Sequence, residues 1–316
     1  MLYKFLLLPA RIFIHFYCRS IVINKKKLLA QKGPLLIASN HPNSFLDAII
    51  LATLFKSPIH SLTRGDAFAN KLITKILTSF HMLPVYRVSE GVENLENNYD
   101  TFSACQDIFK HDGIVLIFSE GRCINEWHLR PLKKGTARLA LEAWQSGIDL
   151  KVLPLGINYS SFRKFGKTVF LNFGNFITRT EIEKDHYSGK TIITFNQKLK
   201  DQLEKLVFEI DSSDKQKRKN YFHFRQSFLK SLLLFIPAAI GFIIHAPLLL
   251  SIHLAIKNKA EDHYDSIVTG LLFFVYPVYV VLVVSILLIL IKSWTALLLL
   301  LLIPFTLWSY VQLSGE

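Results

Sequence analysis

The chain has 316 residues, of which 51% are hydrophobic, and it carries a formal net charge of +13. This composition is too apolar for an ordinary soluble protein, and the positive charge indicates an anionic partner, either a membrane surface or nucleic acid. The three cysteines have no paired spacing, which excludes a disulfide framework or a cysteine zinc motif, and no EF-hand, HExxH, GxGxxG or P-loop pattern appears.

Residues 1–28 are apolar but interrupted by charged residues and Pro9. The segment lacks the features of a secretory signal and has no stretch of about 20 apolar residues that could cross a bilayer. It is therefore predicted to be a helix lying in the membrane interface, followed by Lys25–Lys27 near anionic lipid. A helix packed on the neighbouring domain is the alternative.

Residues 29–210 have the pattern of an α/β domain. Short buried-type strands alternate with longer segments of helical periodicity, which indicates a mixed sheet covered by helices. The strands are expected at 34–39, 81–87, 113–118, 150–157 and 168–174, and the helices at 44–56, 67–80, 97–111, 134–146 and 191–210.

The C-terminal part has a different character. Residues 211–229 form a basic connector, and residues 230–316 contain three long apolar stretches, which predict a transmembrane region of two or three helices. Prolines in the first stretch allow a broken or re-entrant helix. Lys and Arg before this stretch place the α/β domain in the cytoplasm by the positive-inside rule, and a bacterial inner membrane is expected.

The segment SNHPNSFLDAI (39–49) follows the first expected strand of the domain. Ser44 and Asp47 have the spacing of a capping box that would begin the next helix, and His41 would lie in the turn before it. If Asp47 orients the imidazole, His41 can take a proton from a hydroxyl near pH 7, and direct acyl transfer becomes possible. The alternative is that Asp47 only caps the helix and that His41 is a surface residue of the turn with no catalytic role.

Two further segments carry candidate residues. Glu120 and Gly121 follow the strand at 113–118, at the edge where open α/β sheets bind ligands, and Lys133 and Lys134 lie just beyond as candidate anion contacts. Arg87 ends another strand pattern and could bind a phosphate.

Taken together, these segments resemble four motif blocks of the glycerolipid acyltransferases. The first block normally has four residues between His and Asp, whereas NHPNSFLD has five, as in the variant of fungal-type glycerol-3-phosphate acyltransferases. LPVYR (83–87) matches the second block. FSEGRC (118–123) matches the third block, although Arg122 lies one residue earlier than the Arg of the family motif. PLKKGTARLAL (131–141) matches the Lys-Gly helix start, and VLPLGINY (152–159) resembles the fourth block.

The resemblance implies a role for each residue. His41 would be the general base and Asp47 its partner, while Arg87, Glu120 and Gly121 would bind the glycerol phosphate. Arg122, Lys133 and Lys134 would contact phosphate or the acyl donor, which would be acyl-CoA or acyl-ACP (acyl carrier protein). No bound cofactor and no metal are expected.

The expected function is therefore a membrane-bound O-acyltransferase that converts 1-acylglycerol 3-phosphate to phosphatidate, with membrane lipids, the lysophospholipid and the acyl donor as partners. Glycerol 3-phosphate and another lysolipid are alternative acceptors, and a non-catalytic lipid-binding membrane protein is a second alternative. Nucleic-acid binding is not expected, because no basic-aromatic interleaving or recognised motif is present.

Overall fold

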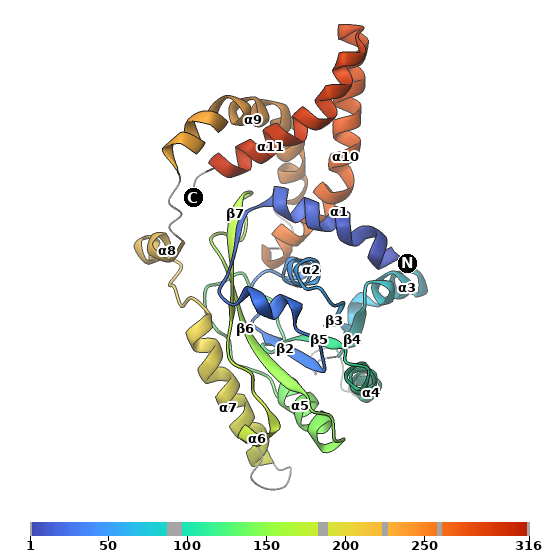
Figure 1. The fold of residues 1–316 in the computed structure, drawn as a ribbon, viewed down its shortest axis with the longest axis vertical. Helices are drawn as coiled ribbons and strands as arrows, with labels where there is room; N and C mark the ends of the chain where they lie inside the picture. Colours follow the sequence, from blue (N-terminus) through green and yellow to red (C-terminus); the bar gives the residue numbers. More distant parts are fainter. Residues whose placement is uncertain (1, 87–96, 183–188, 223–226, 258–260, 315–316) are drawn as a thin grey trace.

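The computed structural model describes residues 2–86, 97–182, 189–222, 227–257 and 261–314. Within these residues, seven strands form one mixed sheet in the order β1-β7-β6-β2-β5-β3-β4 (Figure 1). Every neighbouring pair is parallel except β6 and β7, which are antiparallel. The strands are β1 (Cys18–Ile23), β2 (Leu35–Ser39), β3 (Ile59–Arg64), β4 (Met82–Val85), β5 (Ile114–Phe118), β6 (Lys151–Tyr159) and β7 (Lys167–Phe173).

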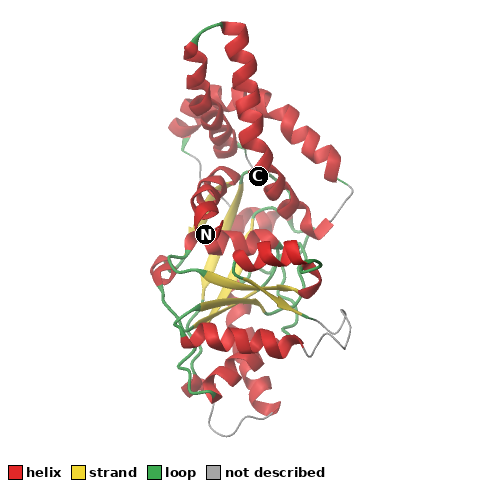
Figure 2. Ribbon diagram, turned by 90° about the vertical axis from the view of Figure 1, so that its right-hand side faces the viewer, coloured by secondary structure: helices red, strands yellow, loops and turns green. Residues whose placement is uncertain are grey.

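Helices cover both faces of the sheet, as the alternation of side chains along a strand requires. In β2, Leu35 and Ile37 face one core with α1 (Leu2–Tyr17) and α2 (Phe45–Leu54). Leu36 and Ala38 face a second core with α4 (Asn97–Lys110), α5 (Gly135–Gln145) and α7 (Gly189–Leu206). Figure 2 shows the strands between these helical layers. The short helices are η1 (Lys26–Ala30), η2 (Gly65–Ala67), α3 (Lys71–Ser79), α6 (Arg179–Ile182) and α8 (Lys215–Phe222).

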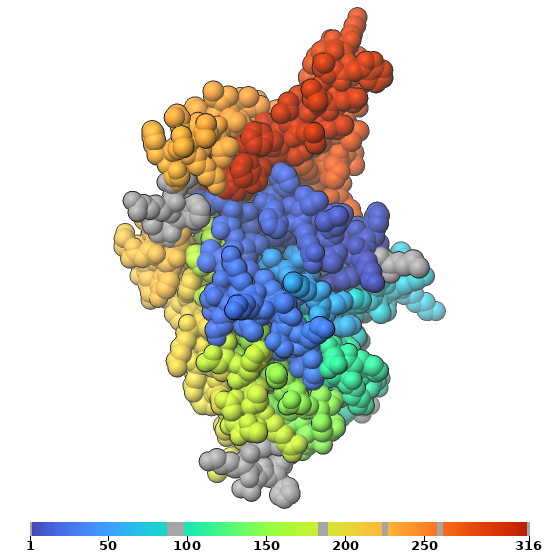
Figure 3. All heavy atoms as spheres, in the orientation of Figure 1, coloured from blue at the N-terminus to red at the C-terminus, as the bar shows by residue number. Residues whose placement is uncertain are grey.

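The mixed α/β sheet expected from the sequence is confirmed, but the N-terminal segment differs from its prediction. The helix expected over 1–28 ends at Tyr17, and Cys18–Ile23 form an edge strand that pairs with β7. The mixed apolar and polar residues of CRSIVI suit an edge strand, which needs only one hydrogen-bonded neighbour. The helix α1 lies between the C-terminal helices and the rest of the α/β domain (Figure 3). Its placement at a lipid surface stays a prediction.

Three helices in the described C-terminal region are long and apolar enough to cross a membrane, namely α9 (Phe228–Ile256), α10 (Tyr264–Ile291) and α11, which continues the short η6 (Trp294–Leu298) over Leu299–Leu313. Large apolar side chains point outward along all three. The first expected span is one continuous helix despite Pro237 and Pro247.

The end of α9 nevertheless packs on the α/β domain, and its start is linked to that domain through α11. At its start, Lys230 Nζ donates to Gln312 Oε1 (2.6 Å), and Gln312 in turn donates to the backbone oxygen of Arg19 in β1. At its other end, Ile252 and Ile256 belong to the same core as β2 and β5. Figure 1 shows α9 as an arch, whereas α10 runs away from the domain and α11 returns to it.

Candidate active site

The candidate site lies where four neighbouring strands end. The parallel strands β3, β5, β2 and β6 all run in one direction, so Arg64, Phe118, Ser39 and Tyr159 end them at the same edge of the sheet. Ligands bind at this carboxyl edge in open α/β sheets. The turn from Asn40 to Ser44 continues from β2 at this edge and leads into α2.

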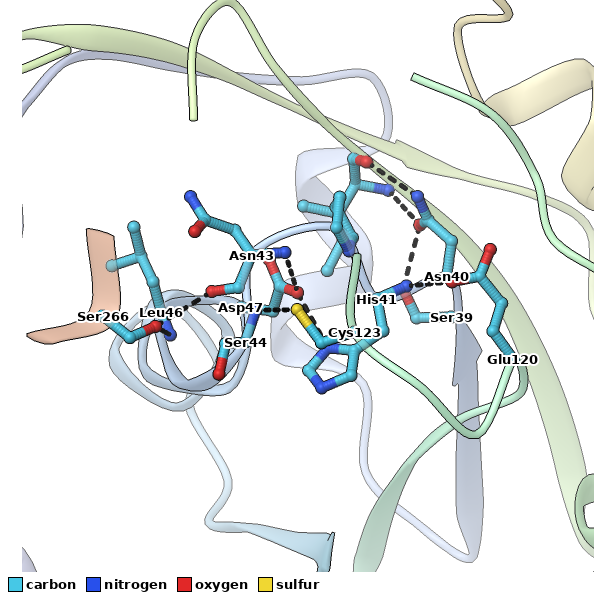
Figure 4. Close-up of polar contacts among 12 residues, drawn as sticks. Ser39, Asn40, His41, Asn43, Ser44, Leu46, Asp47, Glu120, Cys123 and Ser266 are labelled. Atoms are coloured by element: carbon cyan, nitrogen blue, oxygen red, sulfur yellow. Dashed lines mark hydrogen bonds and ion pairs between the residues drawn. The ribbon is translucent and has the colours of Figure 1, made fainter. Parts of the chain in front are cut away.

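The turn is attached to the neighbouring strands by both side chain and backbone. The Asn40 side chain donates to Ile157 O (3.0 Å) and accepts from Ile157 N–H (2.8 Å). On the other side, His41 N–H donates to the Glu120 carboxylate (2.8 Å). Since these contacts come from β6 and from the loop after β5, the turn is attached to the sheet on both sides of His41 (Figure 4).

His41 and Asp47 lie together, as the functional interpretation of their spacing requires. His41 Nδ1 is 2.9 Å from Asp47 Oδ2, and the imidazole stacks on the Phe118 ring with centroids 3.7 Å apart. Asp47 is fully buried and also accepts from Asn43 N–H (2.9 Å) and Tyr159 O–H (2.7 Å). Because a carboxylate only accepts hydrogen bonds, this contact assigns the proton to Nδ1 and leaves the Nε2 lone pair available as a base.

The capping box predicted from Ser44 and Asp47 is wrong in its contacts. The helix does begin after Ser44, but the Ser44 side chain makes no cap hydrogen bond, and its hydroxyl lies 2.9 Å from His263 Nδ1. The Asp47 carboxylate is turned instead toward His41, Asn43 and Tyr159. Ser44 has a φ of 51°, and a positive φ is uncommon for a residue with a side chain.

Glu120 is almost completely buried and links two segments of the site. Its two carboxylate oxygens accept from the backbone N–H groups of His41 (2.8 Å) and Arg130 (2.9 Å). Burial raises the pKa of Glu120 to about 7, although these two hydrogen bonds and the nearby Arg130 oppose the increase. The residue therefore holds the histidine turn against the basic loop, and direct contact with a substrate stays a prediction.

A cleft of about 1710 Å³ opens beside His41 and receives most of the predicted binding residues. Gly121 lies in its wall with a φ of +68°, and a Cβ there would be 3.0 Å from Lys133 Cγ, so the loop suits glycine. The cleft is basic: among the described residues, its lining contains Arg64, Arg122, Arg130, Lys133, Lys134 and Arg138, against Glu120, Glu142 and Asp262. An anionic ligand is favoured in such a cleft. Arg87 lies outside the described residues.

The chemistry of the cysteines argues against a thiol nucleophile. Burial raises the pKa of Cys123 far above its usual range, and Asp47 acts in the same direction. Burial also raises the pKa of Cys18 and of Cys105 to about 12. A thiolate is the reactive form, so none of the three suits acyl transfer through a covalent thioester. In the part of the chain that the structure describes, no cluster of three or more His, Cys, Asp or Glu could hold a metal ion.

Several residues of the site were not found from the sequence. Tyr159 ends β6 at the carboxyl edge, so the strand-end argument that selected Glu120 could have selected it too. Asp262 and His263 also line the cleft, although they precede α10 in the C-terminal region. Burial lowers the pKa of His263, as do Arg64 and His41, whereas Asp262 raises it. The signal in the sequence was EDHYDS (261–266), a polar segment between two long apolar stretches.

The α/β part of this chain is similar to known proteins. Residues 20–158 match the family model described as Acyltransferase, a segment that includes His41, Asp47, Glu120 and the basic loop. A solved structure, the 1-acyl-sn-glycerophosphate (LPA) acyltransferase PlsC from Thermotoga maritima, is similar at 12% identity and a TM-score of 0.44, covering 65% of this chain and 81% of that chain. The search of curated proteins gives no match. The match to the Acyltransferase model over residues 20–158 confirms the relationship that the motifs predicted for the α/β part of the chain.

Proposed function

We propose that this protein is a membrane-bound O-acyltransferase that transfers a fatty acyl group from acyl-CoA or acyl-ACP to 1-acylglycerol 3-phosphate, giving phosphatidate. The observation that carries the proposal is the imidazole of His41, whose Nδ1 is held by the buried Asp47 while the ring borders a basic cleft. The family match supports the reaction class.

The arrangement suits direct transfer. Asp47 keeps the proton on Nδ1, so Nε2 takes the proton of the acceptor hydroxyl as its oxygen attacks the thioester carbonyl. The tetrahedral intermediate then collapses, the carbon–sulfur bond breaks, and the proton on Nε2 passes to the departing thiolate. An ester and a free thiol are formed, and the imidazole returns to its starting state. Arg122, Lys133 and Lys134 would bind the phosphate of the acceptor or of the donor.

The apolar helices beside the cleft favour an acceptor that already carries one acyl chain. The C-terminal helix α10 begins at the cleft, because Asp262 and His263 line it immediately before that helix. The helix α1 lies on the same side of the domain as α10 and α11 (Figure 3), and its exposed Phe5 and Leu8 offer further apolar surface. A lysolipid held in the membrane could therefore reach His41 with its hydroxyl while its chain stays in lipid.

We further propose that the α/β domain lies on the cytoplasmic face of a bacterial inner membrane. The exposed basic residues of α8 precede α9, and this helix lies on the domain side of the apolar helices (Figure 1). The turn between α10 and η6, at the far end of these helices, carries Lys292. This distribution supports a cytoplasmic domain by the positive-inside rule.

An acceptor screen tests the proposal. Purified full-length protein in phospholipid vesicles receives labelled acyl-CoA or acyl-ACP together with glycerol 3-phosphate, 1-acylglycerol 3-phosphate or a lysolipid without phosphate. We expect labelled phosphatidate from the second acceptor. Product from glycerol 3-phosphate alone would show that this compound, and not 1-acylglycerol 3-phosphate, is the acceptor. Product from the phosphate-free lysolipid alone would overturn the assignment of basic residues to a phosphate. Absence of transfer to any acceptor would overturn the proposed function.

A further inference from the structure

The segment Asp262–Ser266, outside the family match, makes contacts with consecutive parts of the turn that carries His41. Ser266 Oγ donates to Asn43 O (3.1 Å) and accepts from Leu46 N–H (3.2 Å). His263 Nδ1 lies 2.9 Å from Ser44 Oγ. Backbone and side chains of the turn from Asn43 to Leu46 are thus held by the start of α10, and Figure 4 shows Ser266 next to Leu46.

A buried polar network extends the same attachment. Asn43 Nδ2 donates to Asp265 Oδ2 (2.6 Å), while Asn43 N–H donates to Asp47 Oδ2 (2.9 Å). Asp265 also pairs with Lys167 of β7 and accepts from Tyr17 O–H of α1. The side chains of this network are all nearly or fully inaccessible to solvent. Asn43 therefore connects the fixed charge pair of Asp265 and Lys167 to the carboxylate that orients His41.

The loop after β5 is held from the same side. Asn125 N–H donates to Asp262 Oδ1 (3.2 Å), and Cys123 Sγ lies 3.7 Å from Asp262 O while accepting from Ser44 N–H (3.0 Å). The α/β domain thus does not close the site alone. Without the segment Asp262–Ser266, Asn43 O, Asn43 Nδ2 and Leu46 N–H would lose the partners that they have here.

We infer that His263, Asp265 and Ser266 are positioning residues of the acyltransferase site, and that the C-terminal helices are required for catalysis as well as for membrane attachment. This inference rests on the proposed function of the His41 site. The imidazole and carboxylate act only when their geometry is maintained, and a displacement of about 1 Å can lower a rate by about 100-fold. The three residues act through the turn that holds His41 and Asp47.

The most direct variant is Ser266→Ala, which removes one hydroxyl at the domain surface of α10. We expect kcat to fall about 10-fold to 100-fold while KM for donor and acceptor changes less than threefold, because orientation is lost and binding is kept. Ser266→Thr keeps the hydroxyl and should recover at least a third of the wild-type kcat. The matched control is Ser285→Ala, an exposed serine further along the same helix, which should behave as wild type.

Hydrogen exchange gives a second readout that does not depend on activity. In Ser266→Ala, the Leu46 amide loses its acceptor and should exchange at least tenfold faster, while the amides of β6 should be unchanged. Asp265→Asn alone would destabilise the fold more, because it leaves the buried Lys167 without a partner charge. The double variant Asp265→Asn with Lys167→Gln removes both charges and so avoids a buried unpaired charge. The double variant should also lose kcat with little change in KM.

The outcomes separate the two proposals. If wild-type protein transfers no acyl group but Ser266→Ala still speeds exchange at Leu46, the proposed function fails and the attachment of the turn stands. If Ser266→Ala and the double variant keep the wild-type kcat in an active enzyme, the positioning role is overturned. Equal exchange at Leu46 in wild type and Ser266→Ala would overturn the attachment itself.

Discussion

The sequences of the α/β part and of the C-terminal helices follow different patterns, yet polar residues of the second region hold the His41 turn of the first. The α/β part follows the general logic of open sheets, in which side chains at the carboxyl ends of parallel strands gather at one edge. The C-terminal helices are almost uncharged, and their composition alone predicts membrane segments. Their polar residues are few, but Asp262, His263, Asp265 and Ser266 are concentrated where they contact the His41 turn. A segment that looks like an anchor can thus contain part of a site.

The contrast between the two regions depends first on the path of α9 relative to the membrane. If α9 arches back to the domain, Ser227→Cys at its start and Lys257→Cys at its end should react with an impermeant maleimide from the same side of the membrane. Ser293→Cys, between α10 and α11, should react from the opposite side. The three natural cysteines are buried and serve as the background. Reaction of positions 227 and 257 from opposite sides would show that α9 crosses the bilayer.

A second test concerns the α/β part alone. Asp47→Asn keeps the shape of the side chain but no longer provides a carboxylate for His41 Nδ1, Asn43 N–H and Tyr159 O–H. The tautomer of His41 is then not fixed, and we expect kcat to fall by about 10³-fold with KM changed less than threefold. Steady-state kinetics in vesicles provide the measurement. A kcat within fivefold of wild type would remove Asp47 from the mechanism.

The third and smallest effect is a dependence of stability on pH. Burial raises the pKa of Glu120 from 4.5 to about 7, so the folded state binds this proton more tightly than the unfolded state does. Its contribution to stability is complete below pH 4.5 and is lost as the pH rises through 7. The difference between 4.5 and about 7, at about 1.4 kcal/mol per pH unit, gives at most about 3.5 kcal/mol.

Glu120→Gln should remove this dependence, because glutamine does not titrate. Thermal unfolding of the solubilised protein between pH 4.5 and 7.5 gives the comparison: wild type should lose more stability than the variant as the pH rises. Parallel curves for the two proteins would contradict the raised pKa of Glu120.

Much of the α/β part could be predicted because its signals are local. Five of the strands were recognised as short runs of apolar residues, and the strand ends led directly to His41 and Glu120. The strands β1 and β3 were missed because CRSIVI and IHSLTR mix polar and apolar residues without a clear buried run. The edge position of β1 and the partly exposed pattern of β3 explain these weaker signals.

The attachment of the C-terminal helices could not be predicted in the same way. Contacts between Asn43 and Asp265 join residues 222 positions apart, and no local pattern records which polar residue meets which turn. The spacing of Ser44 and Asp47 fits a capping box locally, but in the fold the Ser44 side chain contacts His263 and the Asp47 side chain contacts Tyr159. The available signal was Asp265, an acidic residue at the start of a long apolar helix, where a charged residue indicates a function.

The central claim is that the His41 imidazole acts as the base in acyl transfer, and one comparison tests it directly. Purified wild type and His41→Ala are given labelled acyl donor and 1-acylglycerol 3-phosphate in vesicles, with folding checked by thermal unfolding. We predict that kcat falls by about 10³-fold in a folded variant. A folded His41→Ala protein that transfers the acyl group at the wild-type rate would contradict the account.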